Sequence, residues 1–138
     1  MNRDRTSETR LNPAGTHILV VDNNVPRRRL TERVLKQEGF AVAAVGEGFS
    51  AIRAAGERRF NLAIVALALP GTLDGMTTLR HLRGRQPGLG GLFTGDVGQW
   101  PARLDERDDF IASPMQPHEL LGCVFELLQR SRSRLNAS

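Results

Sequence analysis

The strongest constraint on the fold of this chain is a regular alternation between short apolar runs and amphipathic stretches. The apolar runs cover residues 17–21, 41–45, 62–67, 89–93 and 110–112. Between most of them, apolar residues recur at helical spacing, and glycine or proline marks many of the boundaries. This alternation is typical of repeated βαβ units, in which helices cover both faces of a parallel sheet.

The pattern predicts an α/β fold of the (βα)5 type, a three-layer doubly wound sandwich around five parallel strands. The run at 62–67 is the most hydrophobic and is expected at the centre of the sheet, because a strand buried on both faces has no polar side to show. After Pro117, apolar residues at three- and four-residue spacing predict a strong final helix.

The segment between the last two apolar runs departs from this regularity. It contains Gly95, Gly98 and Pro101. These residues leave room for only about two helical turns, near residues 102–106. We therefore expect a shortened fourth helix.

Length and composition indicate one domain. The chain has 138 residues, of which 40% are hydrophobic and 25% charged, so wholesale disorder is excluded. Residues 1–14 and 131–138 are polar and aperiodic, and we interpret them as tails around a domain at 15–130. No apolar run reaches membrane-spanning length and no secretory signal is visible, which favours a cytoplasmic protein away from the membrane.

Candidate functional residues lie where the expected strands end, because open parallel sheets bind ligands at the carboxyl ends of their strands. Asp22 and Asn23 follow the first apolar run. Ala66 lies near the end of the third, and Thr94 and Ser113 follow the fourth and fifth.

Five sequence blocks, taken in order, resemble the receiver domain of two-component response regulators. The blocks are ILVVDNN at 18–24, LALPG at 67–71, DG at 74–75, FTG at 93–95 and FIASP at 110–114. The resemblance covers about residues 16–130. It implies a flavodoxin-like fold with strand order 2-1-3-4-5, shared with the chemotaxis regulators, and a role in bacterial signalling.

The resemblance also implies a phosphorylation chemistry against which this chain can be compared. The family forms an acyl phosphate on an aspartate, helped by an acidic pair that holds Mg²⁺, a hydroxyl and a lysine. The resemblance places Ala66 at the acceptor position and Ser113 at the lysine position. The acidic pair is reduced to Asp22 and the neutral Asn23, whereas Thr94 keeps its hydroxyl.

These departures predict a degenerate receiver, or pseudo-receiver, that is not an enzyme and has no catalytic residues. The residual pocket consists of Asp22, Asn23, Ala66, Thr94 and Ser113. Phe110 stands at the position of the family's switch aromatic and lacks a tyrosine hydroxyl. Asp22 is only a weak residual metal ligand, so we expect Mg²⁺ to bind weakly or not at all, and no other cofactor.

The function we expect is that of a stand-alone receiver in two-component, phosphorelay-type signal transduction. It would act through protein–protein interaction without aspartyl phosphorylation and without a DNA-binding domain. The expected partner is a signalling protein, such as a histidine kinase or another regulator, and a homodimer is left open.

Two alternatives stay open at this point. The first is a conventional receiver that a histidine kinase phosphorylates at a relocated aspartate, for which Asp74 and Asp96 are the other acids near this edge. The second is a nucleic-acid binder, suggested by the net charge of +4. The densest basic cluster, at 27–29, has no recognisable docking motif, and we interpret it as a solvated helix face.

Overall fold

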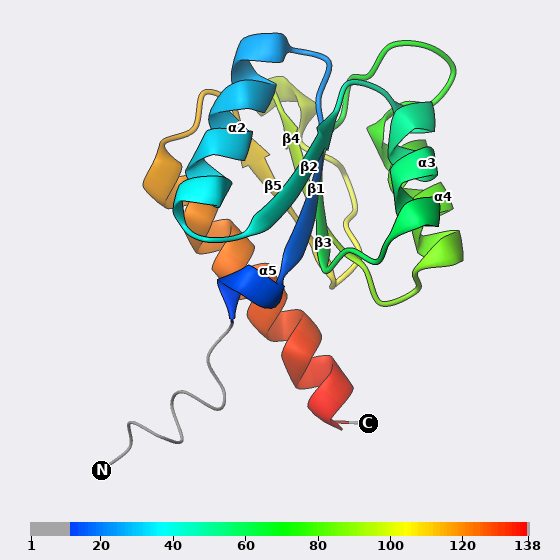
Figure 1. Ribbon diagram of the computed structural model, residues 1–138. Coiled ribbons are helices and arrows are strands. Elements are labelled where there is room, and N and C mark those ends of the chain that lie inside the picture. Colours follow the sequence, from blue (N-terminus) through cyan, green and yellow to red (C-terminus); the bar gives the residue numbers. More distant parts are fainter. Residues whose placement is uncertain (1–11, 138) are drawn as a thin grey trace.

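The computed structural model describes residues 12–137, and side chains as far as Ser131. Five parallel strands form one sheet in the order β2-β1-β3-β4-β5 (Figure 1). The strands are β1 (His17–Val21), β2 (Ala41–Val45), β3 (Leu62–Ala66), β4 (Gly90–Gly95) and β5 (Asp108–Ala112). The α-helices are α2 (Val25–Gln37), α3 (Gly48–Glu57), α4 (Gly75–Arg85) and α5 (Pro117–Ala137), and the 3₁₀ helices are η1 (Pro13–Gly15) and η2 (Val97–Gln99). The predicted fold class and strand order are confirmed.

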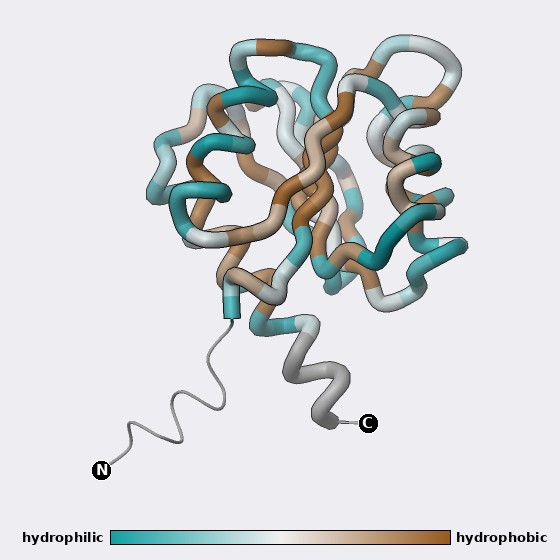
Figure 2. Tube along the Cα trace, viewed as in Figure 1, coloured by the Kyte–Doolittle hydropathy of each residue, from teal (hydrophilic) through white to brown (hydrophobic). Residues whose placement is uncertain are grey.

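Two hydrophobic cores lie on opposite faces of the sheet. Helices α2 and α5 pack over one core, and α3 and α4 over the other. The strands run as a hydrophobic band through the middle of the molecule, while the outer sides of the helices are hydrophilic (Figure 2). All five residues of β3 are buried, as expected for the central and most apolar run.

Polar side chains at the carboxyl edge of the sheet fix where two helices begin. The Asn24 side chain accepts a hydrogen bond from the backbone N–H of Arg27 and caps α2. Asp74 caps α4 in the same way through the N–H of Thr77, at 2.8 Å. Both helix starts therefore lie beside the ends of the strands that precede them.

The predicted fourth helix near residues 102–106 is wrong. The chain instead makes η2 and then continues without helix to β5. Trp100 has an extended ψ of 121° because Pro101 follows it, and an extended residue ends the helical turn. Downstream, the Asp105 carboxylate accepts hydrogen bonds from Arg107, which holds a local turn in place of a helix. Leu104 packs against the core on the α3–α4 face.

The last helix is longer than the apolar spacing indicates. Helix α5 continues to Ala137, so most of the segment interpreted as a C-terminal tail is helical. No proline or glycine occurs after Gly122 to interrupt the helical hydrogen bonds. Most of the predicted N-terminal tail, residues 1–11, lies outside the described residues. Within the described part of the chain, no helix is both long and apolar enough to cross a membrane.

Candidate functional site

The carboxyl edge of the sheet brings the predicted site residues to neighbouring strand ends. Asp22 directly follows β1 and is 4% exposed. Ala66 is the last residue of β3 and pairs in register with Thr94 of β4, and both are buried. Ser113 follows β5, and its N–H donates to the carbonyl of Gly95 at 2.8 Å.

Arg27, from the first turn of α2, holds Asp22 in a two-point ion pair. Its Nε lies 2.5 Å from Asp22 Oδ2 and its Nη2 lies 2.8 Å from Oδ1. The Asn24 N–H also donates to Oδ1 at 2.9 Å, and Arg28 Nη1 donates to the Asp22 carbonyl at 2.8 Å. The hydrogen bonds with Asp22 raise the pKa of the Arg27 guanidinium, although its partial burial opposes the shift. Both carboxylate oxygens of Asp22 are therefore engaged by a cation of the chain itself.

Arg27 is the site residue that the sequence interpretation missed. Residues 27–29 look like one solvated basic cluster, and Arg29 is indeed exposed. Arg27 and Arg28, however, are half-buried and turn back onto Asp22. The available signal was the Asn24 cap, because a helix that begins at Val25 places its first turn next to the end of β1.

The end of β3 is closed by the start of α4. The N–H of Gly75 donates to the Leu67 carbonyl at 2.9 Å. A Cβ at position 75 would lie 2.2 Å from the backbone oxygen of Ala66, so only glycine permits this approach. The side chain of Ala66 brings a methyl group and no oxygen to the site.

The donor atoms at this edge do not fit the Mg²⁺ ion that receivers use. Mg²⁺ requires hard oxygen ligands in near-octahedral geometry. The Asp22 oxygens are occupied by Arg27 and Asn24, and Asn23 is exposed. In the described part of the chain, no three His, Cys, Asp or Glu side chains gather where they could share a metal.

The two other acids near this edge, Asp74 and Asp96, stand at the N-terminal ends of α4 and η2. Asp74 caps α4, and the hydrogen bonds from Thr77 lower the pKa of its carboxyl below the ordinary 3.8. Asp96 is exposed before η2, where its N–H donates to Gln99 Oε1 at 2.8 Å.

The aromatic ring at the expected switch position is covered. Phe110 is 4% exposed, and the Trp100 ring packs against it with the centroids 4.7 Å apart. Trp100 itself stays 60% exposed. The segment that replaces the fourth helix thus supplies the cover over Phe110.

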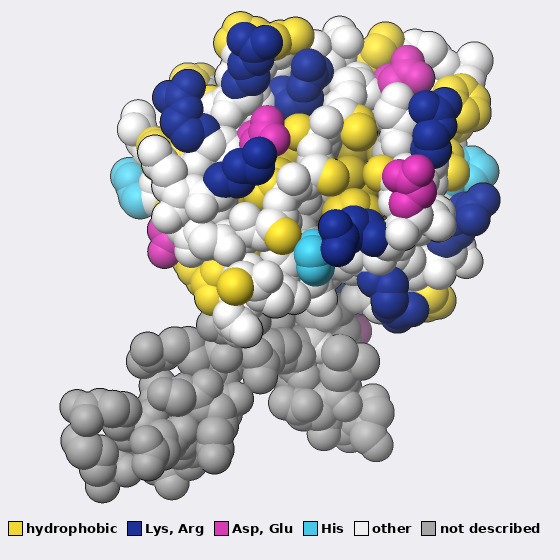
Figure 3. Space-filling model, in the orientation of Figure 1, with side chains coloured by type: hydrophobic (Ala, Val, Ile, Leu, Met, Phe, Trp, Pro, Cys, Tyr) yellow, Lys and Arg dark blue, Asp and Glu magenta, His cyan; other side chains and the backbone are white. Residues whose placement is uncertain are grey.

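Basic side chains do not form one continuous stripe on the face drawn in Figure 3. Dark-blue side chains lie over α2 and near α3, with hydrophobic, acidic and other side chains between them. On α2, Lys36 is paired with Glu32 at 2.9 Å. On this face, the basic side chains are therefore interspersed with other types.

The fold and the strand-end site define a protein of the receiver class, and comparison with known proteins identifies its family. The profile of the response regulator receiver domain matches residues 18–124. The chain therefore belongs to the response regulator receiver family.

Curated relatives extend well beyond the region that matches. The chain is 31% identical over 132 residues to the transcriptional regulatory protein ResD of Bacillus subtilis, covering 93% of this chain and 51% of ResD. It is 32% identical over 117 residues to the DNA-binding response regulator MtrA of Mycolicibacterium paratuberculosis, covering 83% and 52%. The chain thus spans about half the length of the curated relatives it matches.

Solved structures share the fold. NtrX from Brucella abortus, crystallised with ATP, superposes with a TM-score of 0.79 at 24% identity, over 88% of this chain and 28% of NtrX. A CheY-like receiver from Methanospirillum hungatei gives a TM-score of 0.73 at 21% identity, over 86% and 98%. At these identities, the likeness supports the fold alone.

Proposed function

We propose that this receiver acts in two-component signal transduction through protein–protein interaction, without phosphorylation of an aspartate at its strand-end site. One observation carries the proposal. Ala66, which the resemblance assigns to the acceptor position, ends β3, while Arg27 occupies both oxygens of Asp22, the acid that remains.

The chemistry of phosphoryl transfer supports the proposal. The reaction needs a carboxylate nucleophile, and it needs cations to neutralise charge on the transferred group. A methyl group at position 66 cannot attack phosphorus. At position 113, serine is too short and uncharged to replace a lysine. The Arg27 guanidinium is a cation, but Asp22 already neutralises it.

The same ion pair would make the site independent of metal. In a receiver that binds Mg²⁺, the acidic pair needs a counter-charge, because buried like charges repel. Arg27 supplies that counter-charge from within the chain, so the strand ends stay compensated without an ion. The partner surface would then be present at all times. A histidine kinase or another regulator is the class of partner that fits such a module.

The direct test is treatment with acetyl phosphate and, separately, with beryllofluoride, each in the presence of Mg²⁺. We expect no change in intact mass with acetyl phosphate and no bound ¹⁹F signal with beryllofluoride. A stable gain of one phosphoryl mass that maps to Asp74, Asp96 or another aspartate would refute the proposal. That result would establish the relocated acceptor instead.

A rebuilt site tests the assignment of Ala66. The variant Asn23→Asp, Ala66→Asp and Ser113→Lys restores the acidic pair, nucleophile and lysine, beside the existing Thr94. The structure adds a fourth change, Arg27→Ala, because Arg27 competes with Mg²⁺ for Asp22.

The two rebuilt forms make a matched pair. We expect the four-change variant to bind Mg²⁺ and beryllofluoride more tightly than the three-change variant. If the four-change variant folds, as judged by circular dichroism, and binds neither ion, Ala66 does not occupy the acceptor position.

A further inference from the structure

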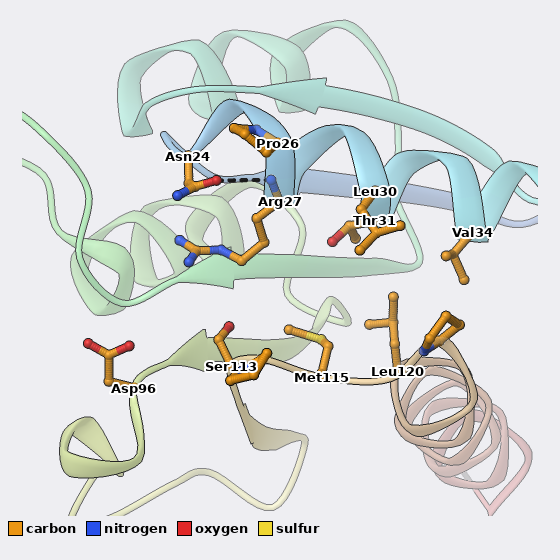
Figure 4. Close-up of a pocket in the computed structure, with 12 residues that line it drawn as sticks. Asn24, Pro26, Arg27, Leu30, Thr31, Val34, Asp96, Ser113, Met115 and Leu120 are labelled. Atoms are coloured by element: carbon orange, nitrogen blue, oxygen red, sulfur yellow. Dashed lines mark hydrogen bonds between the residues drawn. The ribbon is translucent and has the colours of Figure 1, made fainter.

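A cavity of about 460 Å³ opens between α2 and the segment that links β5 to α5 (Figure 4). Its volume lies in the range of sites for small molecules. Most of its wall is apolar and comes from Pro26, Leu30, Val34, Met115, Pro117 and Leu120. Leu30 is 44% exposed, so the apolar wall is open to solvent on the α2 side.

One end of this cavity is polar. Arg27, Asp96 and Ser113 lie together there, and Figure 4 shows the Asp96 carboxylate and the Arg27 guanidinium on the same side of the cavity. The Ser113 hydroxyl is buried and has no hydrogen-bond partner among the described residues.

The two charged side chains at this end differ in their pairing. The Arg27 guanidinium is neutralised by Asp22 through two hydrogen bonds. Asp96 has no ion pair within the described part of the chain, although it is close enough to raise the pKa of Arg27. Among the described residues, the Asp96 carboxylate is therefore left without an ion pair beside an apolar wall.

We propose that this cavity binds a small amphipathic amine. The apolar body lies against Leu30, Val34 and Leu120, and the protonated amine faces Asp96, where a charge-assisted hydrogen bond is available. The Ser113 hydroxyl is a second acceptor for the N–H groups after a rotation about χ1. The proposal is independent of phosphorylation, because none of these contacts involves the acceptor position.

An acid with the same apolar body fits less well. Its carboxylate would face Asp96, and like charges repel. Its only cationic partner on the cavity wall would be Arg27, whose charge Asp22 already neutralises through Nε and Nη2. The cavity should therefore discriminate by the sign of the head group, which gives the proposal a sharp test.

The test uses tryptamine and indole-3-propionate, which share an indole body and carry opposite charges at neutral pH. Each is titrated into the ¹⁵N-labelled protein and followed by amide chemical shifts. We expect saturable shifts with tryptamine at Leu30, Val34, Met115 and Leu120. Tryptamine should bind about five-fold or more tightly than the acid.

Two variants separate the head-group contact from nonspecific attraction. Asp96→Asn removes the unpaired charge at an exposed position, and it should abolish the preference for the amine. Glu106→Gln removes an exposed negative charge that does not line the cavity, and it should leave the preference intact.

Three outcomes would overturn the proposal. The first is no saturable shift up to about 5 mM tryptamine, which is weaker than a useful site allows. The second is equal affinity for the amine and the acid in the unmodified protein. The third is a set of shifts that maps away from α2 and the start of α5. The acetyl phosphate experiment reports on the proposed function separately, so failure of one can be told from failure of the other.

Discussion

Replacement of Arg27 by methionine tests whether this residue compensates the charge of Asp22. Methionine keeps much of the apolar stem of the side chain and removes the guanidinium. The Asp22 carboxylate would then stay buried, and its remaining donor among the described residues would be the Asn24 N–H at 2.9 Å. We expect the variant to fold and to lose stability.

The structure sets the size of the loss. The Asp22 side chain is 6% exposed and that of Arg27 is 32% exposed. Removing one partner of a fully buried pair costs about 3–5 kcal/mol, and exposed pairs contribute about 0–1 kcal/mol. Because Arg27 is about one-third exposed and Asp22 keeps a hydrogen bond, we expect a loss of about 2 kcal/mol, between these two ranges.

Urea unfolding at neutral pH measures this loss. With a slope of about 1.5 kcal/mol per molar urea, the midpoint should fall by about 1 M or slightly more. Arg29→Met is the matched control, because Arg29 is the same residue type, two positions along the same helix and exposed. The control should change the free energy of unfolding by no more than about 0.5 kcal/mol.

A double-mutant cycle completes the test. Asp22→Asn leaves an amide that does not need a counter-charge, so adding it to Arg27→Met should recover about half of the loss or more. The reasoning is refuted if Arg27→Met is as stable as Arg29→Met. It is also refuted if the effects of Asp22→Asn and Arg27→Met simply add.

Further predictions concern how residues of α4 and β5 contribute to the free energy of unfolding, and urea unfolding measures each. Arg83→Met strips the buried Asp108 of its ion-pair partner and should cost about 3 kcal/mol, because Arg83 and Asp108 side chains are 15% and 4% exposed. Gly75→Ala should cost about 2 kcal/mol or more, because the new Cβ meets the Ala66 carbonyl, whereas Gly84→Ala in the same helix meets nothing within 4 Å and should stabilise by about 0.5–1 kcal/mol. Asp74→Ala should cost about 1 kcal/mol at neutral pH by removing the cap of α4. Since the pKa of Asp74 is lowered in the fold, this contribution is complete above the ordinary value of 3.8 and fades as the pH falls below it, so the two proteins should converge in acid. These accounts would be contradicted if either glycine variant were as stable as the parent. They would also be contradicted if Asp74→Ala remained less stable than the parent in strong acid.

The strands were predictable because burial on both faces leaves only apolar side chains along a strand. The runs at 17–21 and 41–45 coincide with β1 and β2, and that at 62–67 differs from β3 by one residue. Strand β5 begins earlier than its apolar core, at Asp108, because Arg83 neutralises that buried acid. Sequence periodicity cannot reveal such a pairing, since Arg83 lies 25 residues away.

The site was predictable in its positions and less so in its contacts. The carboxyl ends of parallel strands meet at one edge, and the strand order 2-1-3-4-5 that the resemblance implied makes neighbours of the strands that end near Asp22, Ala66 and Thr94. The ion pair with Arg27 depends on which of the three arginines turn back toward β1, and that follows from the register of α2 after its cap. Likewise, five residues free of glycine and proline suggested a helix over 102–106, whereas the hydrogen bonds from Arg107 to Asp105 hold a turn there after the extended Trp100 ends η2.

Two side-chain contacts at the carboxyl edge hold residues of the site in place without a bound ion. Arg27 forms an ion pair with Asp22, and Trp100 covers Phe110. Rotation of the Phe110 ring outward would require the indole to leave it, and aromatic contacts of this kind contribute about 0.5–1.5 kcal/mol beyond the area they bury. Neither contact needs a metal or a phosphoryl group, so both exist in the resting protein. The cavity beside α2 differs from these two contacts, because Asp96 has no ion pair there and the Ser113 hydroxyl has no hydrogen-bond partner among the described residues.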